Sequence, residues 1–170
     1  MTEQEVAAFL ALPGKTLVRS MSWSMKDGNY TPPIWVFQSA LQIGAASPEG
    51  VYVRAFYREA FVIEKGAAKI EAPDSMGVNL HIGNDLVFGV HTHVGQEHQN
   101  SPKIGAGRPY FGQLINAATH EHIWVGEYGY AEPLADLLLL EQVFARFFTE
   151  TNIVGITYVD PMRGQQGRLI

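Results

Sequence analysis

The sequence of 170 residues contains no cysteine. This absence excludes disulfide bridges, thiol nucleophiles, zinc fingers and iron–sulfur clusters. Basic residues are also few, because 12 Lys and Arg stand against 17 Asp and Glu, and the formal net charge is −5 with neutral histidines. A protein that grips nucleic acid by overall positive charge is therefore disfavoured, whereas a local basic groove is still compatible with the composition.

Long apolar runs are also missing. The most apolar stretch, at 137–140, is bounded by Asp136 and Glu141 and falls far short of the ~20 residues that a membrane-spanning helix needs. Residues 1–12 carry no basic cluster of the kind found in signal peptides. We therefore expect a cytoplasmic protein without a membrane segment.

The residues that are present suit a folded protein. Apolar residues make up 46% of the chain and aromatic residues 11%, which is enough for a hydrophobic core and argues against disorder. The length corresponds to one domain of ordinary size. We predict that residues 1–162 form a single α+β domain and that residues 163–170 form a C-terminal tail.

Two helices are predicted. Thr2 and Glu5 have the spacing of a capping box, and Pro13-Gly14 ends the short N-terminal helix that follows it. Near the C-terminus, Pro133 is expected to open a long amphipathic helix that Asn152 ends. The apolar stripe of this second helix consists of Leu137, Leu140, Phe144, Phe147 and Phe148.

Most of the remaining chain has strand character. Asp27-Gly28-Asn29 and Gly83-Asn84-Asp85 are typical hairpin turns. The spacing of apolar residues predicts strands at 17–25, 34–41, 51–63, 68–71, 78–82, 86–94, 114–125 and 153–159. We predict an α+β fold in which the two helices pack on a curved, mainly antiparallel β-sheet.

All six histidines lie between His81 and His122. Four of them form two pairs with i, i+2 spacing, His91-Thr92-His93 and His120-Glu121-His122. Residues i and i+2 of a strand point to the same face, so each pair projects two imidazoles together. A site built from both pairs requires them to lie on adjacent strands, within about 5 Å of each other.

Two interpretations of the histidines stay open. They can be polar or half-buried rings without chemistry, or they can form a site, because histidine is the commonest metal ligand and titrates near neutral pH. In a site that binds a divalent metal such as zinc, the ligands would be His91, His93, His120 and His122. The candidate proton carriers are Glu97, His98, His120 and His122.

Basic residues suggest a phosphate-bearing substrate. Residues 95–112 are rich in glycine and poor in apolar groups, and they place Lys103 and Arg108 close to the histidines in sequence. Arg54 and Arg58 share a strand face with two aromatic residues, Tyr52 and Phe56. That second set suits either nucleic-acid binding or cation–π packing on a sheet surface.

Two metal-site signatures match in part. His91, His93 and Glu97 resemble the first cupin motif, although Gly105 stands one place late. His91, His93 and Ser101 also have the spacing of JAMM deubiquitinases. In that motif Val94 replaces the proline and Ile104 replaces the aspartate ligand. Neither the cupin motif nor the JAMM motif is therefore complete.

Residues 85–150 resemble small bacterial and phage proteins of which TumE-type toxins are the named members. The shared features are the turn at Asp85, the loop that carries His98, and His120-Glu121-His122 at the start of a strand that a helix follows. Gly83 departs from the arginine of those toxins, and His98-Gln99 departs from their doublet of histidines. The resemblance implies a nuclease-like or toxic activity, or a role in defence on a mobile element.

Two functions therefore compete. The first is a small hydrolase built on the histidines, metal-dependent or not, that acts on phosphodiesters or nucleic acid. The second is a binding protein without catalysis, such as a phage inhibitor of a bacterial defence system, similar in role to anti-CRISPR proteins, or an immunity protein. The net charge of −5 favours a protein partner, as does the predicted C-terminal helix, where four acidic residues from Glu132 to Glu150 stand against Arg146. A homo-oligomer is compatible with either function.

Overall fold

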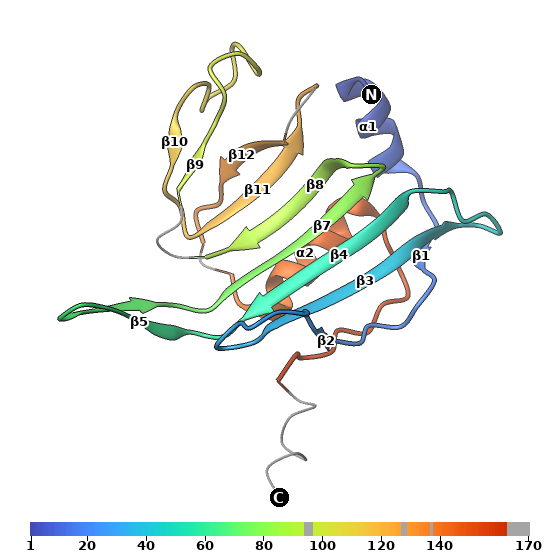
Figure 1. The fold of residues 1–170 in the computed structure, drawn as a ribbon. Helices are drawn as coiled ribbons and strands as arrows, with labels where there is room; N and C mark the ends of the chain where they lie inside the picture. The colour runs from blue at the N-terminus through green and yellow to red at the C-terminus, as the bar shows by residue number, and fades with distance from the viewer. Residues whose placement is uncertain (94–96, 127–128, 137, 163–170) are drawn as a thin grey trace, which may run out of the picture.

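The computed structural model describes residues 1–93, 97–126, 129–136 and 138–162 (Figure 1). The predicted tail 163–170, Val94 and Leu137 lie outside the described residues. The elements are α1 Glu3–Ala11, β1 Lys15–Leu17, β2 Ser24–Met25, β3 Ile34–Ile43, β4 Val51–Arg58, β5 Phe61–Lys65, β6 Ala68–Ala72, β7 Ser75–Ile82, β8 Asp85–Thr92, β9 His98–Gln99, β10 Leu114–Ile115, β11 Thr119–Trp124, β12 Gly129–Pro133 and α2 Leu140–Thr151.

One antiparallel sheet dominates the structure. Its strand order is β1-β3-β4-β7-β8-β11-β12, and β2 also pairs with β3. The sheet is open, because β1 and β12 stand at its two ends. Two further antiparallel ribbons, β5–β6 and β9–β10, lie outside it. The predicted α+β fold with a mainly antiparallel sheet and two helices is confirmed.

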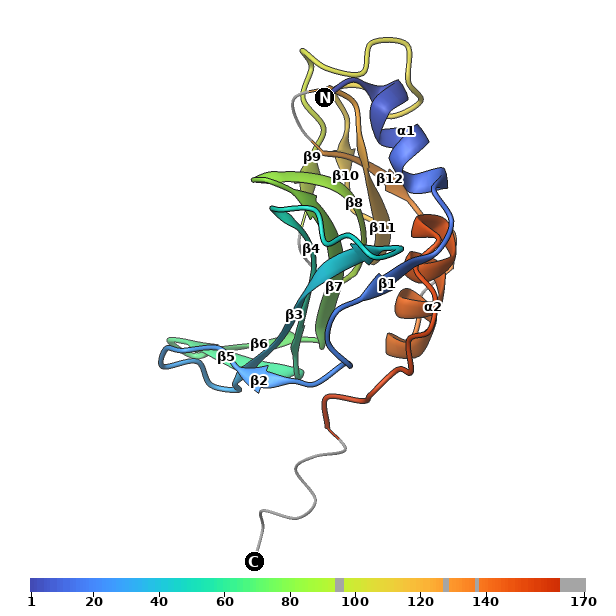
Figure 2. The same cartoon turned by 90° about the vertical axis from the view of Figure 1, so that its right-hand side faces the viewer.

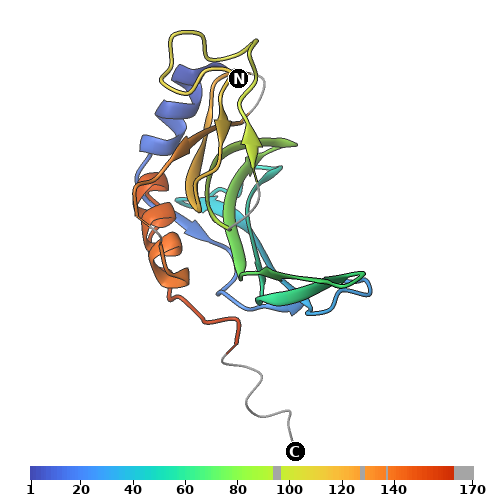
Figure 3. The same ribbon diagram turned by 90° about the vertical axis from the view of Figure 1, so that its left-hand side faces the viewer.

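The two faces of the sheet have different surroundings. Both helices lie on one side, while the β5–β6 ribbon projects on the other (Figures 2 and 3). Strand β4 shows the reason, because Val51, Val53, Ala55 and Tyr57 are buried and the residues between them are more exposed. The buried face packs on α2, where Phe147 stacks on a ring of β8. We call the other face, which neither helix covers, the open face.

Helix α1 forms as predicted. Thr2 and Glu5 make both hydrogen bonds of the capping box, and Val6 is buried in the core. Lys15 completes the other end: its fully buried ammonium donates to the carbonyl oxygens of Phe9 and Leu10 at 3.0 Å each, and also to that of Leu12. A cation at a helix C-terminus satisfies carbonyl groups that have no partner within the helix.

Helix α2 begins later than predicted. Pro133 is the last residue of β12, where it lies opposite His120, and α2 starts only at Leu140. Leu138 and Leu139 therefore precede the helix. The predicted end is correct, because Asn152 adopts the left-handed conformation, with φ of 52°, and closes the helix. Neither helix in the described part of the chain is long and apolar enough to cross a membrane.

Several predicted strands have different limits. The strand predicted at 17–25 is two short strands, β1 and β2. The one predicted at 51–63 breaks after Arg58, where the chain leaves the sheet to form the β5–β6 ribbon, and the one at 114–125 divides into β10 and β11. Residues 153–159 form no strand beyond a single bridge between Ile153 and Lys15. Apolar spacing does not distinguish a straight strand from two that a bend separates.

Candidate histidine site

Strand pairing brings the two histidine pairs together. In the register of β8 and β11, His91 lies directly opposite His120, and His122 lies opposite Gly89. The ring centroids of His91 and His122 are 4.5 Å apart, and those of His91 and His120 are 5.5 Å apart. The pairs therefore lie on adjacent strands, on the open face and at the separation that a common site requires.

Two more rings complete a group that we call the histidine cluster. His93, just beyond the end of β8, has its ring centroid 4.8 Å from that of His120. His98 comes from the β9–β10 ribbon, and its ring centroid is 4.9 Å from that of His122. The cluster comprises His91, His93, His98, His120 and His122. The sixth histidine, His81, stands apart and stacks on Tyr52.

Two glycines make room for the cluster. A Cβ atom on Gly77 would lie 2.6 Å from His91 Cδ2 and 2.5 Å from Phe56 Cε1, so a larger residue would displace both rings. A Cβ atom on Gly89 would lie 2.4 Å from Asn79 Oδ1. Both glycines lie inside strands, where glycine often marks a close approach of other groups.

Asn79 orients one ring of the cluster. Its Oδ1 lies 2.6 Å from His91 Nε2. Because an amide oxygen only accepts hydrogen bonds, Nε2 of His91 donates, and its Nδ1 retains the free lone pair. Such a hydrogen bond to the second ring nitrogen is a usual accompaniment of metal-binding histidines. Nothing in the sequence alone pointed to Asn79 as part of the site.

Burial keeps the imidazoles neutral. Burial, together with the smaller effect of nearby histidines of the cluster, lowers the pKa of His120 to about 4 and that of His122 to about 3. The pKa of His91 falls well below its ordinary value for the same two reasons, burial first. Burial also lowers the pKa values of His93 and His98. At neutral pH the rings are therefore in the form that binds metals or accepts protons.

Three of the rings lie close enough together that they could hold one metal ion. One nitrogen each from His91, His120 and His122 lies within 4.8 Å of the other two. The Nε2 atoms of His120 and His122 are 3.1 Å apart, close to the spacing of about 3.3 Å between ligands that bind a tetrahedral zinc at ~2.0–2.1 Å. His93 borders this trio but does not belong to it.

A cavity of about 550 Å³ opens beside the cluster. His98, His122 and Lys103 line it, so the structure brings the predicted basic residue Lys103 to the histidines. Leu86 also lines it, although regular alternation along a strand would place Leu86 on the face opposite to Gly89 and His91. Between the pairs Leu80–Phe88 and His81–Leu86, β8 has one extra residue, and this bulge turns Leu86 to the open face.

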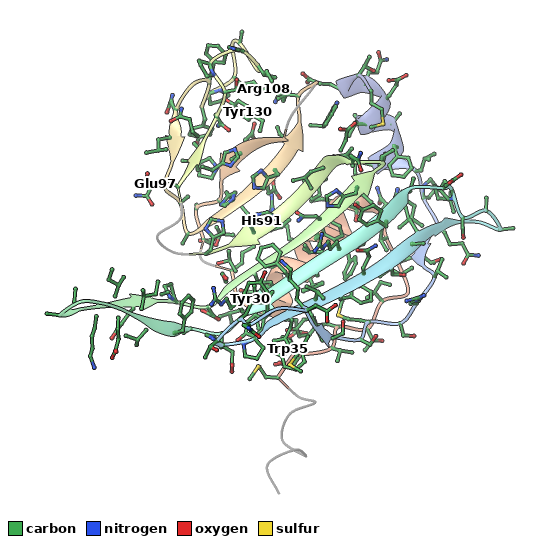
Figure 4. All side chains as sticks on the ribbon, in the orientation of Figure 1. Tyr30, Trp35, His91, Glu97, Arg108 and Tyr130 are labelled. Carbon is green, nitrogen blue, oxygen red and sulfur yellow. The ribbon has the colours of Figure 1, made fainter. Side chains whose placement is uncertain are left out.

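Two predicted site residues are elsewhere. Arg108 Nη2 lies 2.5 Å from Glu3 Oε2 and its Nη1 lies 3.7 Å from Glu132 Oε1, so it is held by ion pairs and does not line the cavity. Glu97 is exposed just before β9, and its side chain points away from His91 (Figure 4). The predictions of Arg108 as a phosphate contact and Glu97 as a proton carrier find no support in this geometry.

Comparisons with protein-family models, with curated proteins and with solved structures find no match for this chain. The resemblance of residues 85–150 to TumE-type toxins stays a prediction, as do the partial cupin and JAMM signatures.

Proposed function

We propose that the histidine cluster binds a divalent transition metal ion and that the protein is a metal-dependent hydrolase of phosphodiesters. The observation that carries the proposal is the meeting of nitrogen atoms from His91, His120 and His122 within 4.8 Å of one another. Three histidines with further coordination positions left open are typical of catalytic zinc sites, whereas structural sites use four protein ligands.

The surroundings of the trio support metal binding. The hydrogen bond from His91 to Asn79 holds one ring in a single tautomer. Glu121, the acidic residue between His120 and His122, points away from the cluster, because it pairs with Arg146 of α2 on the other face of the sheet. The site therefore offers neutral nitrogen donors and no carboxylate from β11, a donor set that suits zinc, copper, nickel or iron better than magnesium or calcium.

The cavity supports an anionic substrate. Lys103 is exposed, lines the cavity with His122, and takes part in no ion pair within the described residues. Its ammonium group is therefore available to a phosphate oxygen. A bound divalent metal would supply an activated water and polarise the phosphoryl oxygen.

His98 is the candidate general base. Its ring is next to that of His122, it lines the cavity, and it lies outside the metal-binding trio. Burial lowers its pKa, so at neutral pH it carries a lone pair that can accept a proton. His93, buried beside His120, is assigned to packing around the trio.

Hydrolysis of bis(p-nitrophenyl) phosphate tests the proposal. Protein freed of metal by chelation should be inactive, and Zn²⁺, Mn²⁺ or Co²⁺ should restore turnover. His122→Ala should remove the restored activity, and His98→Gln should lower kcat by ~10²-fold or more. Lys69→Gln, on the exposed β5–β6 ribbon, is the control and should retain it. A protein that binds metal but hydrolyses no phosphodiester would contradict the proposed activity and favour a binding protein.

A further inference from the structure

The open face carries a continuous band of side chains that ends at the histidine cluster. In the register of the sheet, Arg54 of β4 lies opposite Asn79 of β7, Asn79 opposite Gly89 of β8, and Gly89 opposite His122 of β11. The neighbouring rows run from Phe56 through Gly77 to His91 and from Tyr52 to His81. The sequence separates the basic and aromatic residues of β4 from the cluster, whereas the fold joins them on one face.

The charge of this face is opposite to that of the whole chain. Among the described residues of β3, β4, β7, β8 and β11 that share the face, none is Asp or Glu. Arg54 is exposed there and forms no ion pair within the described residues. The pKa of His81 is lowered mainly by burial and, to a smaller extent, by the nearby positive charge of Arg54. In a protein of net charge −5, the described face residues of these five strands thus carry positive fixed charges and no negative ones.

Arg58 has a different role. Its guanidinium lies over the ring of Phe61, 3.9 Å from the centroid, and one of its amino groups donates to the Thr31 carbonyl at 3.3 Å. Cation–π packing, one of the two interpretations that the sequence left open, therefore applies to Arg58. Arg54 has no such ring partner in the described part of the chain and is available to a ligand.

Aromatic rings accompany the positive charge. The rings of Tyr52 and His81 stack with centroids 4.8 Å apart and an angle of 5° between their planes. Phe56 contacts His91 edge to face, with centroids 5.6 Å apart. Both sets of rings are partly exposed on the open face. Rings on which bases stack, together with cations that contact the backbone, are the usual components of a surface for single-stranded nucleic acid.

We propose that the open face binds single-stranded nucleic acid and leads one of its phosphodiesters to the histidine cluster. The proposal rests on the proposed function and names its substrate class. Three strand spacings of ~4.8 Å separate Arg54 from His122, about 14 Å in all. At ~3.4 Å for each stacked nucleotide, this span holds about four nucleotides. A duplex is excluded as the preferred ligand, because its bases are paired and not free to stack on Tyr52 and His81.

Fluorescence anisotropy of labelled oligonucleotides with the metal-free protein tests this proposal. DNA and RNA of one mixed sequence, in lengths of 2, 4, 8 and 12 nucleotides, are compared with a 12-base-pair duplex. We expect the affinity to rise steeply between 2 and about 4–8 nucleotides and to be lower for the duplex. The separate DNA and RNA arms show which of the two backbones is preferred.

Two variants and one control locate the surface. Arg54→Gln should weaken binding several-fold and reduce the slope of log K against log salt by ~0.7, the contribution of one phosphate contact on a single strand. Tyr52→Leu should weaken binding by about tenfold or more, with thermal unfolding measured to show that it folds. Arg19→Gln, at an exposed arginine outside the open face, should bind as the wild type does.

The outcomes separate this proposal from the preceding one. Absence of oligonucleotide binding at 50 mM salt, equal binding of the duplex, or equal effects of Arg19→Gln and Arg54→Gln would overturn the open-face proposal. Such a result would leave the proposed hydrolase activity standing, because hydrolysis of bis(p-nitrophenyl) phosphate tests the histidine cluster and does not require the open face to bind an oligonucleotide. Conversely, oligonucleotide binding without any metal-dependent hydrolysis would support the open face as a binding surface and overturn the proposed activity.

Discussion

Acid should destabilise the metal-free protein, because its buried histidines are neutral in the folded state and take up protons when the chain unfolds. His120 and His122 have folded-state pKa values of about 4 and about 3, both below the ordinary value of 6.5 for histidine. Between these values the unfolded chain binds more protons than the native one, so the free energy of unfolding falls as the pH decreases. The loss begins near pH 6.5 and continues down to about pH 4 for His120 and about pH 3 for His122.

The size of the effect follows from the same values. Each unit of pH below 6.5 costs about 1.4 kcal/mol for each histidine that is protonated only in the unfolded chain. At pH 5 this amounts to about 2 kcal/mol for His122 and about the same for His120. A combined loss of about 4 kcal/mol is a large part of the ~5–15 kcal/mol that stabilises a typical domain.

Urea unfolding followed by tryptophan fluorescence at pH 8, 6.5, 5.5 and 5 measures this loss. The difference in unfolding free energy between pH 8 and pH 5 should be smaller by about 2 kcal/mol in His122→Gln, because one of the groups that take up a proton only on unfolding is removed. Lys69→Gln is the matched control and should show the wild-type difference. An unfolding free energy that is constant or increases from pH 8 to pH 5 would show that the buried histidines do not oppose folding in acid.

Three further predictions concern single side chains. Gly77→Ala should lower metal affinity by ~10–100-fold, because its Cβ atom displaces His91, and calorimetric titration of Zn²⁺ that gives the wild-type affinity would contradict this. Lys103→Gln should lower kcat/KM for a phosphodiester by about tenfold with little change in unfolding free energy, and an unchanged kcat/KM would remove Lys103 from the site. Lys15→Met should lower the unfolding free energy by about 2 kcal/mol, because it leaves carbonyl oxygens at the end of α1 without a donor, and an unchanged urea midpoint would show that water replaces the ammonium.

The parts of the fold that local chemistry decides could be predicted from the sequence. The capping box at Thr2 and the left-handed cap at Asn152 depend on residues a few positions apart, and both are present. The turn at Gly83-Asn84 likewise joins β7 and β8. The prediction that Pro133 opens a helix was wrong, because a proline suits the first turn of a helix and also the end of an edge strand. Only the pairing of β12 with β11 decides between the two.

Only those features of the site that follow from strand periodicity could be predicted from the sequence. The i, i+2 spacing placed His120 and His122 on one face, but the register that sets His91 opposite His120 depends on long-range pairing. The same holds for Asn79, which comes from a strand between the basic face of β4 and the histidines. The ion pair of Arg108 could not be predicted either, because its partner Glu3 is over a hundred residues away in the sequence.

Calorimetric titration of Zn²⁺ into chelator-treated protein at pH 7.5 directly tests whether the histidine cluster binds a metal ion. We expect one ion bound for each chain, loss of that binding in both His120→Ala and His122→Ala, and wild-type stoichiometry in His81→Gln, in which the histidine outside the cluster is replaced. If the wild type binds no zinc, or if both alanine variants bind it as the wild type does, the histidine cluster is not a metal site.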